Sequence, residues 1–425
     1  MARKMKDSGI EWIGEIPEGW EVVKAKYLFA QRNEKGNSAL VLLSPTQKYG
    51  VIPQSQLEGV VQVKENTDLR TFKTIHIGDF VISLRSFQGG FEFSNYEGVC
   101  SPAYQVFHAT KDLSNDFFRY LFKSDGFISK INSLTVGIRE GKNIQYWDFS
   151  NMLLALPPKE VQIRSAQYLS AKCTEIDTML SKTRSSIEEY KKLKQAVITQ
   201  AVTKGVRGER EMKDSGVEWI GEIPKEWGRT KIKMIASFFN GDRTSRYPQP
   251  SDFVDSGVAF LTSRNIDSDE VDLSETKYIT DDKYKSLSGA KIQIDDIIFC
   301  LRGSVGKCAI NRTLSCGTVA SSLATIRPKD IYPEYLLYFL LSNIASTQTT
   351  IFMNGTCAAN LSAESVGNYY ITLPISAEQK EIADYLDAKC AEIDKLIAKK
   401  EQLVKELESY KKSLIYEVVT GKREV

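Results

Sequence analysis

Basic and amide side chains occur in the sequence where short apolar runs end. Two such runs, residues 75–85 (IHIGDFVISLR) and 292–302 (IQIDDIIFCLR), predict buried strands that each end in an arginine. Arginine and lysine can donate to guanine O6 and N7, and glutamine can pair with adenine N6 and N7. An arginine that pairs with a buried carboxylate would give the same pattern, so both interpretations stay open. The candidate base-reading residues at these two positions are Arg85, Ser86, Gln88, Arg302, Ser304 and Lys307.

Further candidates lie in loops rich in turn residues. The segments SPTQKYGVIPQ, NGDRTSRYP and TSRNID combine basic, aromatic and amide side chains with glycine or proline. Two other loops, VGIREGKN and NGTCAAN, are as consistent with contacts to backbone phosphates as with base readout. The candidates from these loops are Lys48, Tyr49, Gln54, Arg139, Lys142, Asn143, Arg243, Arg246, Arg264 and Asn360.

Motifs of catalysis are missing from the sequence. It contains no GxxxxGK[ST] phosphate loop, no HExxH, no GxSxG and no [N/D]PP[Y/F] tetrad of the adenine-methyltransferase kind. The chain has only two histidines, and none of its seven cysteines forms a CxxC pair. We therefore expect no catalytic residues, no metal site and no disulfide framework.

Charge alone does not identify a nucleic-acid partner. The formal net charge is +2, and residues 21–150 carry 15 Lys and Arg against 13 Asp and Glu. Residues 228–367 carry 15 of each kind. DNA affinity would require charge gathered on one face, or positive charge from a partner subunit. The sequence also lacks a secretory leader and any apolar run of 18 residues, so we expect a cytoplasmic protein without membrane spans.

A long amphipathic helix is predicted twice. Residues 158–205 return as a similar segment at 375–422, and residues 162–182 and 379–399 are identical at 11 of 21 positions. Apolar residues alternate at steps of three and four, which is the a/d stripe of a coiled coil. About 44 residues at 1.5 Å each would form a rod of about 65 Å. The stripe residues that we expect in the helix–helix core are Leu169, Ile176, Leu180, Ile187, Leu386, Ile393, Ile397 and Val404.

A second repeat precedes each half of the chain. MKDSGIEWIGEIP at residues 5–17 returns as MKDSGVEWIGEIP at 212–224, with 12 of 13 positions identical. Between each block and its long helix lies a variable stretch with short strand patterns, including 39–44 and 258–263, and helical patterns at 117–124 and 335–342. The predicted fold class is α+β, with four segments: 1–157, 158–207, 208–374 and 375–425.

The repeats also predict how the helices run. The second variable domain follows the end of the first helix and precedes the start of the second, so a compact arrangement makes the helices antiparallel. A pseudo-two-fold axis would then relate the halves. The same symmetry places the C-terminus near the N-terminal block.

Two strings carry a family resemblance. The repeated block KDSGIEWIGEIPEGW and the pattern LP-x-x-x-EQ-x-x-I-x-x-YL at residues 373–386 resemble the specificity subunit of type I restriction-modification systems. The likeness covers the whole chain, as two target recognition domains that alternate with two conserved helical regions. The first helix departs from the pattern by carrying Val161 where the second carries Glu378.

The resemblance implies a DNA-binding adaptor without catalysis of its own. Each recognition domain would read one half of a bipartite target on double-stranded DNA, and the helices would set the spacer. Two adenine methyltransferase subunits would bring S-adenosylmethionine, and restriction subunits would use ATP and Mg²⁺. A coiled-coil scaffold without DNA recognition is the alternative that the weak net charge leaves open.

Overall fold

The computed structural model describes residues 3–35, 40–57, 69–83, 90–134, 144–266, 269–353 and 360–425. The chain divides into two compact units, Met1–Arg184 with Gln402–Val425 (unit 1) and Ser185–Glu401 (unit 2). This division cuts both long helices, whereas the four predicted segments keep each helix whole. The predicted segment boundaries therefore stay a prediction.

Unit 1 mixes short strands with short helices. Its elements before the first long helix are β1 (Met5–Ile10), β2 (Gly14–Pro17), β3 (Glu21–Lys24), β4 (Phe29–Arg32), β5 (Leu43–Thr46), β6 (Gly50–Pro53), β7 (Lys73–Ile75), β8 (Phe80–Ile82), β9 (Phe91–Phe93), β10 (Gly98–Cys100), β11 (Gln105–Ala109), α1 (Asn115–Leu121), α2 (Asp125–Ser133), α3 (Tyr146–Ser150) and β12 (Leu153–Leu156).

An antiparallel sheet in the order β4-β11-β8-β9 organises the core of unit 1. The side chains on its helix-covered face are mostly phenylalanines, because large apolar rings fill the space between a sheet and its helices. Phe80 and Phe107 stack at 5.3 Å between centroids, and Phe122 of the α1 C-terminus meets Phe80 edge-on at 5.2 Å. The predicted strand at 39–44 is displaced: β5 begins only at Leu43.

Unit 2 contains a comparable set of elements. They are β13 (Met212–Asp214), β14 (Glu222–Pro224), β15 (Gly228–Lys231), β16 (Ala236–Asn240), β17 (Phe253–Val254), β18 (Val258–Leu261), β19 (Lys277–Ile279), α5 (Asp281–Ser286), β20 (Ile297–Cys300), β21 (Cys308–Ile310), β22 (Gly317–Val319), β23 (Leu323–Pro328), α6 (Pro333–Leu341), α7 (Asn343–Phe352), α8 (Ala363–Gly367) and β24 (Tyr370–Leu373).

The main sheet of unit 2 repeats the topology of unit 1. Its order β16-β23-β20-β21 corresponds strand by strand to β4-β11-β8-β9. Unit 2 adds a second sheet, β17-β19-β18-β22, in which β18 and β22 are parallel. The two variable domains therefore share a framework and differ in what surrounds it.

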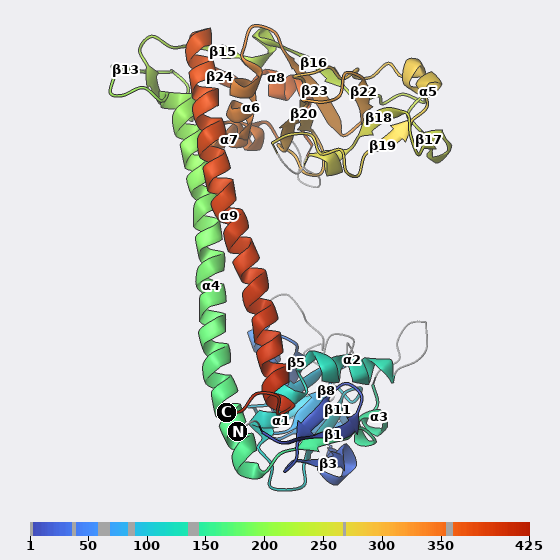
Figure 1. The fold of residues 1–425 in the computed structure, drawn as a ribbon. Helices are drawn as coiled ribbons and strands as arrows, with labels where there is room; N and C mark the ends of the chain where they lie inside the picture. Colours follow the sequence, from blue (N-terminus) through green and yellow to red (C-terminus); the bar gives the residue numbers. More distant parts are fainter. Residues whose placement is uncertain are drawn as a thin grey trace. The chain divides into compact units, whose positions relative to one another are not determined.

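The two long helices are α4 (Lys159–Lys204) and α9 (Ser376–Val419), and they run antiparallel in each unit (Figure 1). In unit 1, Lys411 donates to Asp177 at 2.6 Å and Arg184 donates to Glu408 at 2.5 Å. In unit 2, Lys194 donates to Asp394 at 2.8 Å. The Lys411–Asp177 and Lys194–Asp394 pairs are related by the 217-residue repeat, so the internal repeat extends to single ion pairs.

The apolar stripe faces the helix–helix interface in each unit. Two of its residues, Ile397 and Val404, are half-buried. The buried members are Leu169, Ile176, Leu180, Ile187, Leu386 and Ile393.

The C-terminus lies against the N-terminal block within unit 1, as the repeat predicted (Figure 1). Tyr416 of α9 donates from its hydroxyl to the carbonyl of Trp12 at 3.1 Å, and the Lys422 ammonium donates to the carbonyl of Ile13 at 2.5 Å. This prediction is confirmed.

Candidate nucleic-acid interface

The predicted site residues of unit 2 gather where strand β20 ends. The backbone N–H of Leu301 donates to the carbonyl of Ser322 at 2.9 Å, and the N–H of Leu361 donates to the carbonyl of Leu301 at 3.0 Å. Arg302 and Asn360 form an isolated antiparallel bridge. Both of these side chains are exposed. Three loops that are far apart in the sequence therefore meet around Arg302.

Arg243 joins this cluster from the loop after β16. Its Nε donates to the carbonyl of Ser321 at 3.3 Å, one residue from the carbonyl that binds Leu301. Burial lowers the pKa of Arg243, and the positive charge of Arg302 lowers it further. Within the described part of the chain, neither guanidinium forms an ion pair with a carboxylate. Two like charges are thus held together with open hydrogen-bond donors.

The loop that carries Arg243 is fixed by the buried carboxylate of Asp242. This carboxylate accepts hydrogen bonds from the N–H and hydroxyl of Thr244, at 2.7 and 2.6 Å, and from the N–H of Ser288 at 2.8 Å. Burial by itself would raise the pKa of Asp242, but the hydrogen bonds from Thr244 and Ser288 hold the pKa well below its ordinary value. The carboxylate therefore stays ionised and anchors the loop.

Two glycines permit this close approach of backbones. A Cβ on Gly241 would lie 2.2 Å from the carbonyl oxygen of Ala320, and a Cβ on Gly289 would lie 2.4 Å from the backbone nitrogen of Asp242. Any other residue at either place would push the loops apart, so glycine is a requirement of the cluster.

The remaining unit 2 candidates are more dispersed. Ser304 and Lys307 are exposed in the turn between β20 and β21, where the N–H of Lys307 donates to the carbonyl of Ser304 at 3.2 Å. The Nε of Arg246 lies 3.5 Å from the Thr244 hydroxyl. Arg264 follows β18 in the second sheet, and its only ion pair among the described residues is an exposed one with Glu275 at 3.9 Å.

In unit 1 the structure describes only three of the predicted site residues. Lys48 and Tyr49 form the tip of the β5–β6 hairpin, with the Lys48 ammonium 4.9 Å from the centroid of the exposed Tyr49 ring. Gln54 follows β6, and its buried Oε1 has no hydrogen-bond partner in the described part of the chain. The candidates that lie outside the described residues, and stay predictions, are Arg85, Ser86, Gln88, Arg139, Lys142 and Asn143.

Sequence reasoning missed two basic residues beside this hairpin tip. Lys48 and Tyr49 line a cavity of about 490 Å³ that Arg119 and Lys123 of the α1 region also line. The Lys123 ammonium donates at 2.6 Å to Glu92, and burial raises the pKa of Glu92 although Lys123 opposes the shift. The i,i+4 spacing of Arg119 and Lys123 in FFRYLFKS could have indicated a shared basic face.

The described residues contain neither a metal-binding group nor a membrane-spanning helix. No group of three or more His, Cys, Asp or Glu side chains could hold a metal ion in the part of the chain that the structure describes. Among the described helices, none is long and apolar enough to span a membrane.

Comparisons with known proteins agree on one family. Residues 224–406 match the type I restriction modification DNA specificity domain. The MjaVIII specificity subunit of Methanocaldococcus jannaschii is 24% identical over 423 residues, covering 96% of this chain and 93% of the relative. The sequence is therefore similar to type I specificity subunits.

Other specificity subunits extend this likeness. The EcoBI specificity subunit of Escherichia coli is 25% identical over 279 residues, which cover 64% of this chain and 58% of that subunit. A chain from a study of complex assembly and conformational transition in a type I restriction-modification system matches 96% of this chain at a TM-score of 0.74 and 16% identity. The HsdS subunit of Thermoanaerobacter tengcongensis matches 96% at a TM-score of 0.53 and 16% identity.

The family match places the unit 2 cluster in a specificity domain. The matched range 224–406 includes Arg243, Arg302 and Asn360 together with the loops that hold them. The exposed, basic, rigidly anchored cluster is therefore part of the domain for which this family is defined.

Proposed function

We propose that this chain is the sequence-specific DNA-binding subunit of a type I restriction-modification enzyme. It acts as a non-catalytic recognition subunit and reads a bipartite target on double-stranded DNA. The observation that carries this proposal is the pairing of Arg243 with Arg302 on an exposed face without a described carboxylate partner. Two adjacent guanidiniums repel each other, and an anion placed between them relieves that repulsion.

DNA supplies the matching chemistry. A phosphate oxygen pair or the O6 and N7 edge of guanine accepts two parallel N–H bonds from one guanidinium. The adjacent exposed Asn360 offers an amide that can pair with adenine in the same groove. The cluster thus provides both positioning and base-reading groups within one rigid surface.

Two dissimilar half-sites follow from the two units. Their main sheets have the same strand order, but unit 2 carries the second sheet β17-β19-β18-β22 and unit 1 carries the β5–β6 hairpin with Lys48 and Tyr49 at its tip. Because different loops surround one framework, each unit presents a different set of side chains to a groove.

Spacing and partners complete the proposal. The antiparallel helices α4 and α9 set the spacer between the half-sites and dock two adenine methyltransferase subunits. Those subunits carry S-adenosylmethionine, and restriction subunits carry ATP and Mg²⁺. Partner subunits also supply positive charge, which fits a chain with a net charge of only +2.

The decisive experiment is genome-wide mapping of methylated adenines in cells with and without this gene. A bipartite motif that disappears with the gene is the expected result. An unchanged methylome together with no specific DNA retention by the assembled complex would favour the scaffold alternative.

At the level of residues, Arg302→Ala should weaken specific DNA binding by about 1–3 kcal/mol if the guanidinium makes a bidentate base contact. A phosphate contact would instead reduce the salt slope of binding by about 0.9 without relaxing the sequence preference. To separate these cases, DNA binding is measured at several salt concentrations with the full chain assembled with its partner subunits. Lys225→Ala removes an exposed charge outside the cluster and serves as the control.

A folded Arg302→Ala variant with unchanged affinity, salt slope and target would contradict the assignment. Arg302 would then be a surface arginine without a role in recognition. Arg243→Ala should behave like Arg302→Ala, because the two guanidiniums share one ligand in this proposal.

A further inference from the structure

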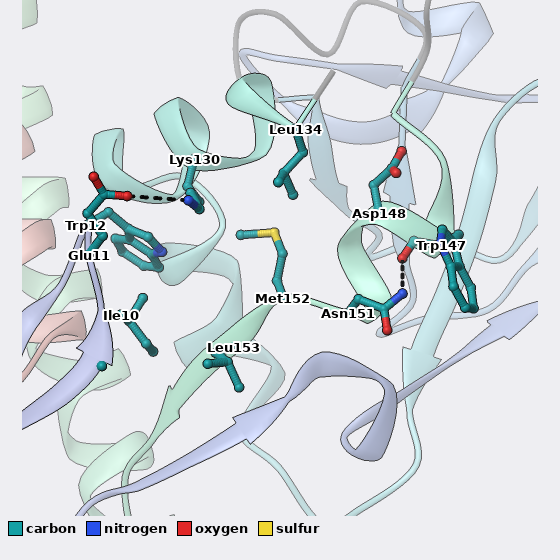
Figure 2. Close-up of a pocket in the computed structure, with 11 residues that line it drawn as sticks. Ile10, Glu11, Trp12, Lys130, Leu134, Trp147, Asp148, Asn151, Met152 and Leu153 are labelled. Carbon is teal, nitrogen blue, oxygen red and sulfur yellow. Dashed lines mark hydrogen bonds and ion pairs between the residues drawn. The ribbon is translucent and has the colours of Figure 1, made fainter. Parts of the chain in front are cut away.

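Unit 1 contains an apolar groove that the proposed DNA interface does not use. It lies between β1, α2, α3 and β12, has a volume of about 550 Å³, and is lined in part by Gly9, Leu134, Trp147, Met152 and Leu153 (Figure 2). The Trp147 side chain is 73% exposed. A large aromatic side chain at the edge of an apolar groove is typical of a binding surface. We call it the Trp147 groove.

The internal repeat supplies a second copy of this place for comparison. Leu153 of β12 pairs with Lys24 of β3, and Tyr370 of β24 pairs with Lys231 of β15. Leu153 and Tyr370 are therefore equivalent. The repeated block makes Gly9 equivalent to Gly216, and both glycines have a φ of +67°.

In unit 2 an arginine fills the equivalent place. The Nη1 of Arg229 donates to the carbonyl of Gly216 at 3.1 Å, and the guanidinium carbon lies 5.4 Å from the centroid of the Tyr370 ring. The Tyr370 ring thus contacts one flat face of the guanidinium, and the Gly216 carbonyl accepts from its edge.

Val22 stands where Arg229 would be, so no described side chain of unit 1 repeats this contact. A Cβ built on Gly216 would meet the Arg229 Nη2 at 3.1 Å, whereas a Cβ built on Gly9 meets no described atom within 4 Å. Val22 is too short to reach the glycine and packs instead with the cluster that contains Ile10. Among the described residues, the space beside this glycine is therefore filled in unit 2 and open in unit 1.

The rim of the groove favours a cation. Glu11 and Asp148 line it with Lys130, so its formal charge is negative. Glu11 and Lys130 are 3.5 Å apart, but Glu11 is 89% exposed, and such a surface pair contributes little. The Glu11 carboxylate can therefore turn to a second cation.

We infer that the Trp147 groove is a docking site for an arginine side chain presented by a partner protein subunit. The arginine enters between Gly9 and Leu153 as Arg229 lies between Gly216 and Tyr370, with Glu11 as the counter-charge. Because unit 2 occupies this place with its own Arg229, the arginine contact forms at unit 1 alone. The kind of partner, a methyltransferase subunit, rests on the proposed function, whereas the arginine chemistry does not.

The first test uses the full chain and the capped peptide acetyl-Gly-Arg-Gly-amide. We expect a saturable shift of the Trp147 indole resonance, assigned with Trp147→Phe, and weaker binding of the corresponding lysine peptide.

Val22→Arg should fill the groove as Arg229 does in unit 2 and weaken peptide binding at least tenfold, whereas Val22→Leu should keep peptide binding. Glu11→Gln, which leaves the core intact, should weaken binding several-fold. Saturable binding that survives in a folded Val22→Arg variant, or no binding to the wild-type chain, would overturn the inference.

The second test measures assembly with the methyltransferase subunit by mass photometry. Assembly that is at least tenfold weaker in Val22→Arg than in Val22→Leu supports the partner. If the wild-type chain assembles with no methyltransferase, the proposed function fails and so does this partner, while the peptide result still stands. Two other outcomes would overturn the partner assignment. If Val22→Arg abolishes self-association, the arginine that enters the groove comes from a second copy of this chain. If Arg139→Ala raises the affinity for the peptide, Arg139 of the same chain competes for the groove.

Discussion

Glu378 and Val161 occupy the same place in the two copies of the long helix, and the structure shows what the difference does. The buried Glu378 carboxylate accepts from the Arg210 Nη2 at 2.5 Å and from the Trp227 indole N–H at 3.0 Å. In unit 1 the indole N–H of Trp20, the equivalent of Trp227, has no hydrogen-bond partner among the described residues. A single substitution between the repeats thus decides whether a buried polar group is satisfied.

Glu378→Ala should therefore destabilise unit 2 by about 1–3 kcal/mol, because it leaves the buried Trp227 N–H without an acceptor and Arg210 with only the exposed Glu226 carboxylate. Urea unfolding followed by tryptophan fluorescence measures the loss. Glu381→Ala is the matched control, since its half-exposed pair with Arg207 should contribute much less to stability. Equal effects of the two substitutions would contradict this account.

A repeated glutamine shows what the sequence could predict at this scale. The identity of Gln162 and Gln379 is visible in the aligned repeats, but their task is not. The Gln162 Oε1 accepts from the N–H of Ser114, which precedes α1, and the Gln379 Oε1 accepts from the N–H of Tyr332, which precedes α6. These acceptors lie 48 and 47 residues from their donors, so no local pattern reveals the contact.

The long helices were the most predictable elements, because an apolar stripe of constant period is a local property of the sequence. Their antiparallel pairing followed from the repeat. The arginine cluster was not predictable as a cluster. Arg243 and Arg302 were both candidates, but their proximity depends on the intervening Ser321 carbonyl, on Asp242 and on glycines whose role is visible only when two loops meet.

At the scale of the helix, inserting four residues after Arg184 should lengthen the spacer by one or two base pairs and spare both half-sites. Four residues add about 6 Å, close to two base-pair rises, but they overshoot a full turn by about 40°, close to the twist of one base pair. Methylome mapping of the variant measures the spacer. A two-residue insertion, which turns the apolar stripe by about 200°, is the control that should abolish assembly. If the four-residue variant methylates targets with the original spacer, the hypothesis that helix length sets the spacer is wrong.

For the whole molecule, the repeat predicted the internal symmetry but not the common sheet. The two variable domains match only weakly in sequence, yet both have four strands in the same order. Strand order depends on contacts across the domain, and different apolar side chains can make the same contacts. The common strand order of the two sheets therefore could not be predicted from the sequence. The differences between the two variable domains, in contrast, were evident in the sequence.

This framework indicates where the chain can be cut to exchange one recognition domain. Strand β3 (Glu21–Lys24) pairs with β12 (Leu153–Leu156), and the N–H of Ala25 donates to the carbonyl of Met152 at 2.8 Å. The exchanged segment should therefore begin after Lys24 and end before Met152, so that the two-stranded pair stays with α4 and the N-terminal block. A cut at residue 21 would separate the two strands.

Replacing residues 25–151 with the corresponding segment of another specificity subunit should change one half of the target and leave the other half and the spacer unchanged. The reason is that unit 1 has its own phenylalanine core and its own sheet, so the graft folds without help from the loops of unit 2. Methylome mapping reads both half-sites and the spacer in one experiment. The reciprocal exchange of residues 232–368 is the control and should change only the other half. If either exchange altered both half-sites together, recognition would not be modular, and the two units could not be treated as independent readers.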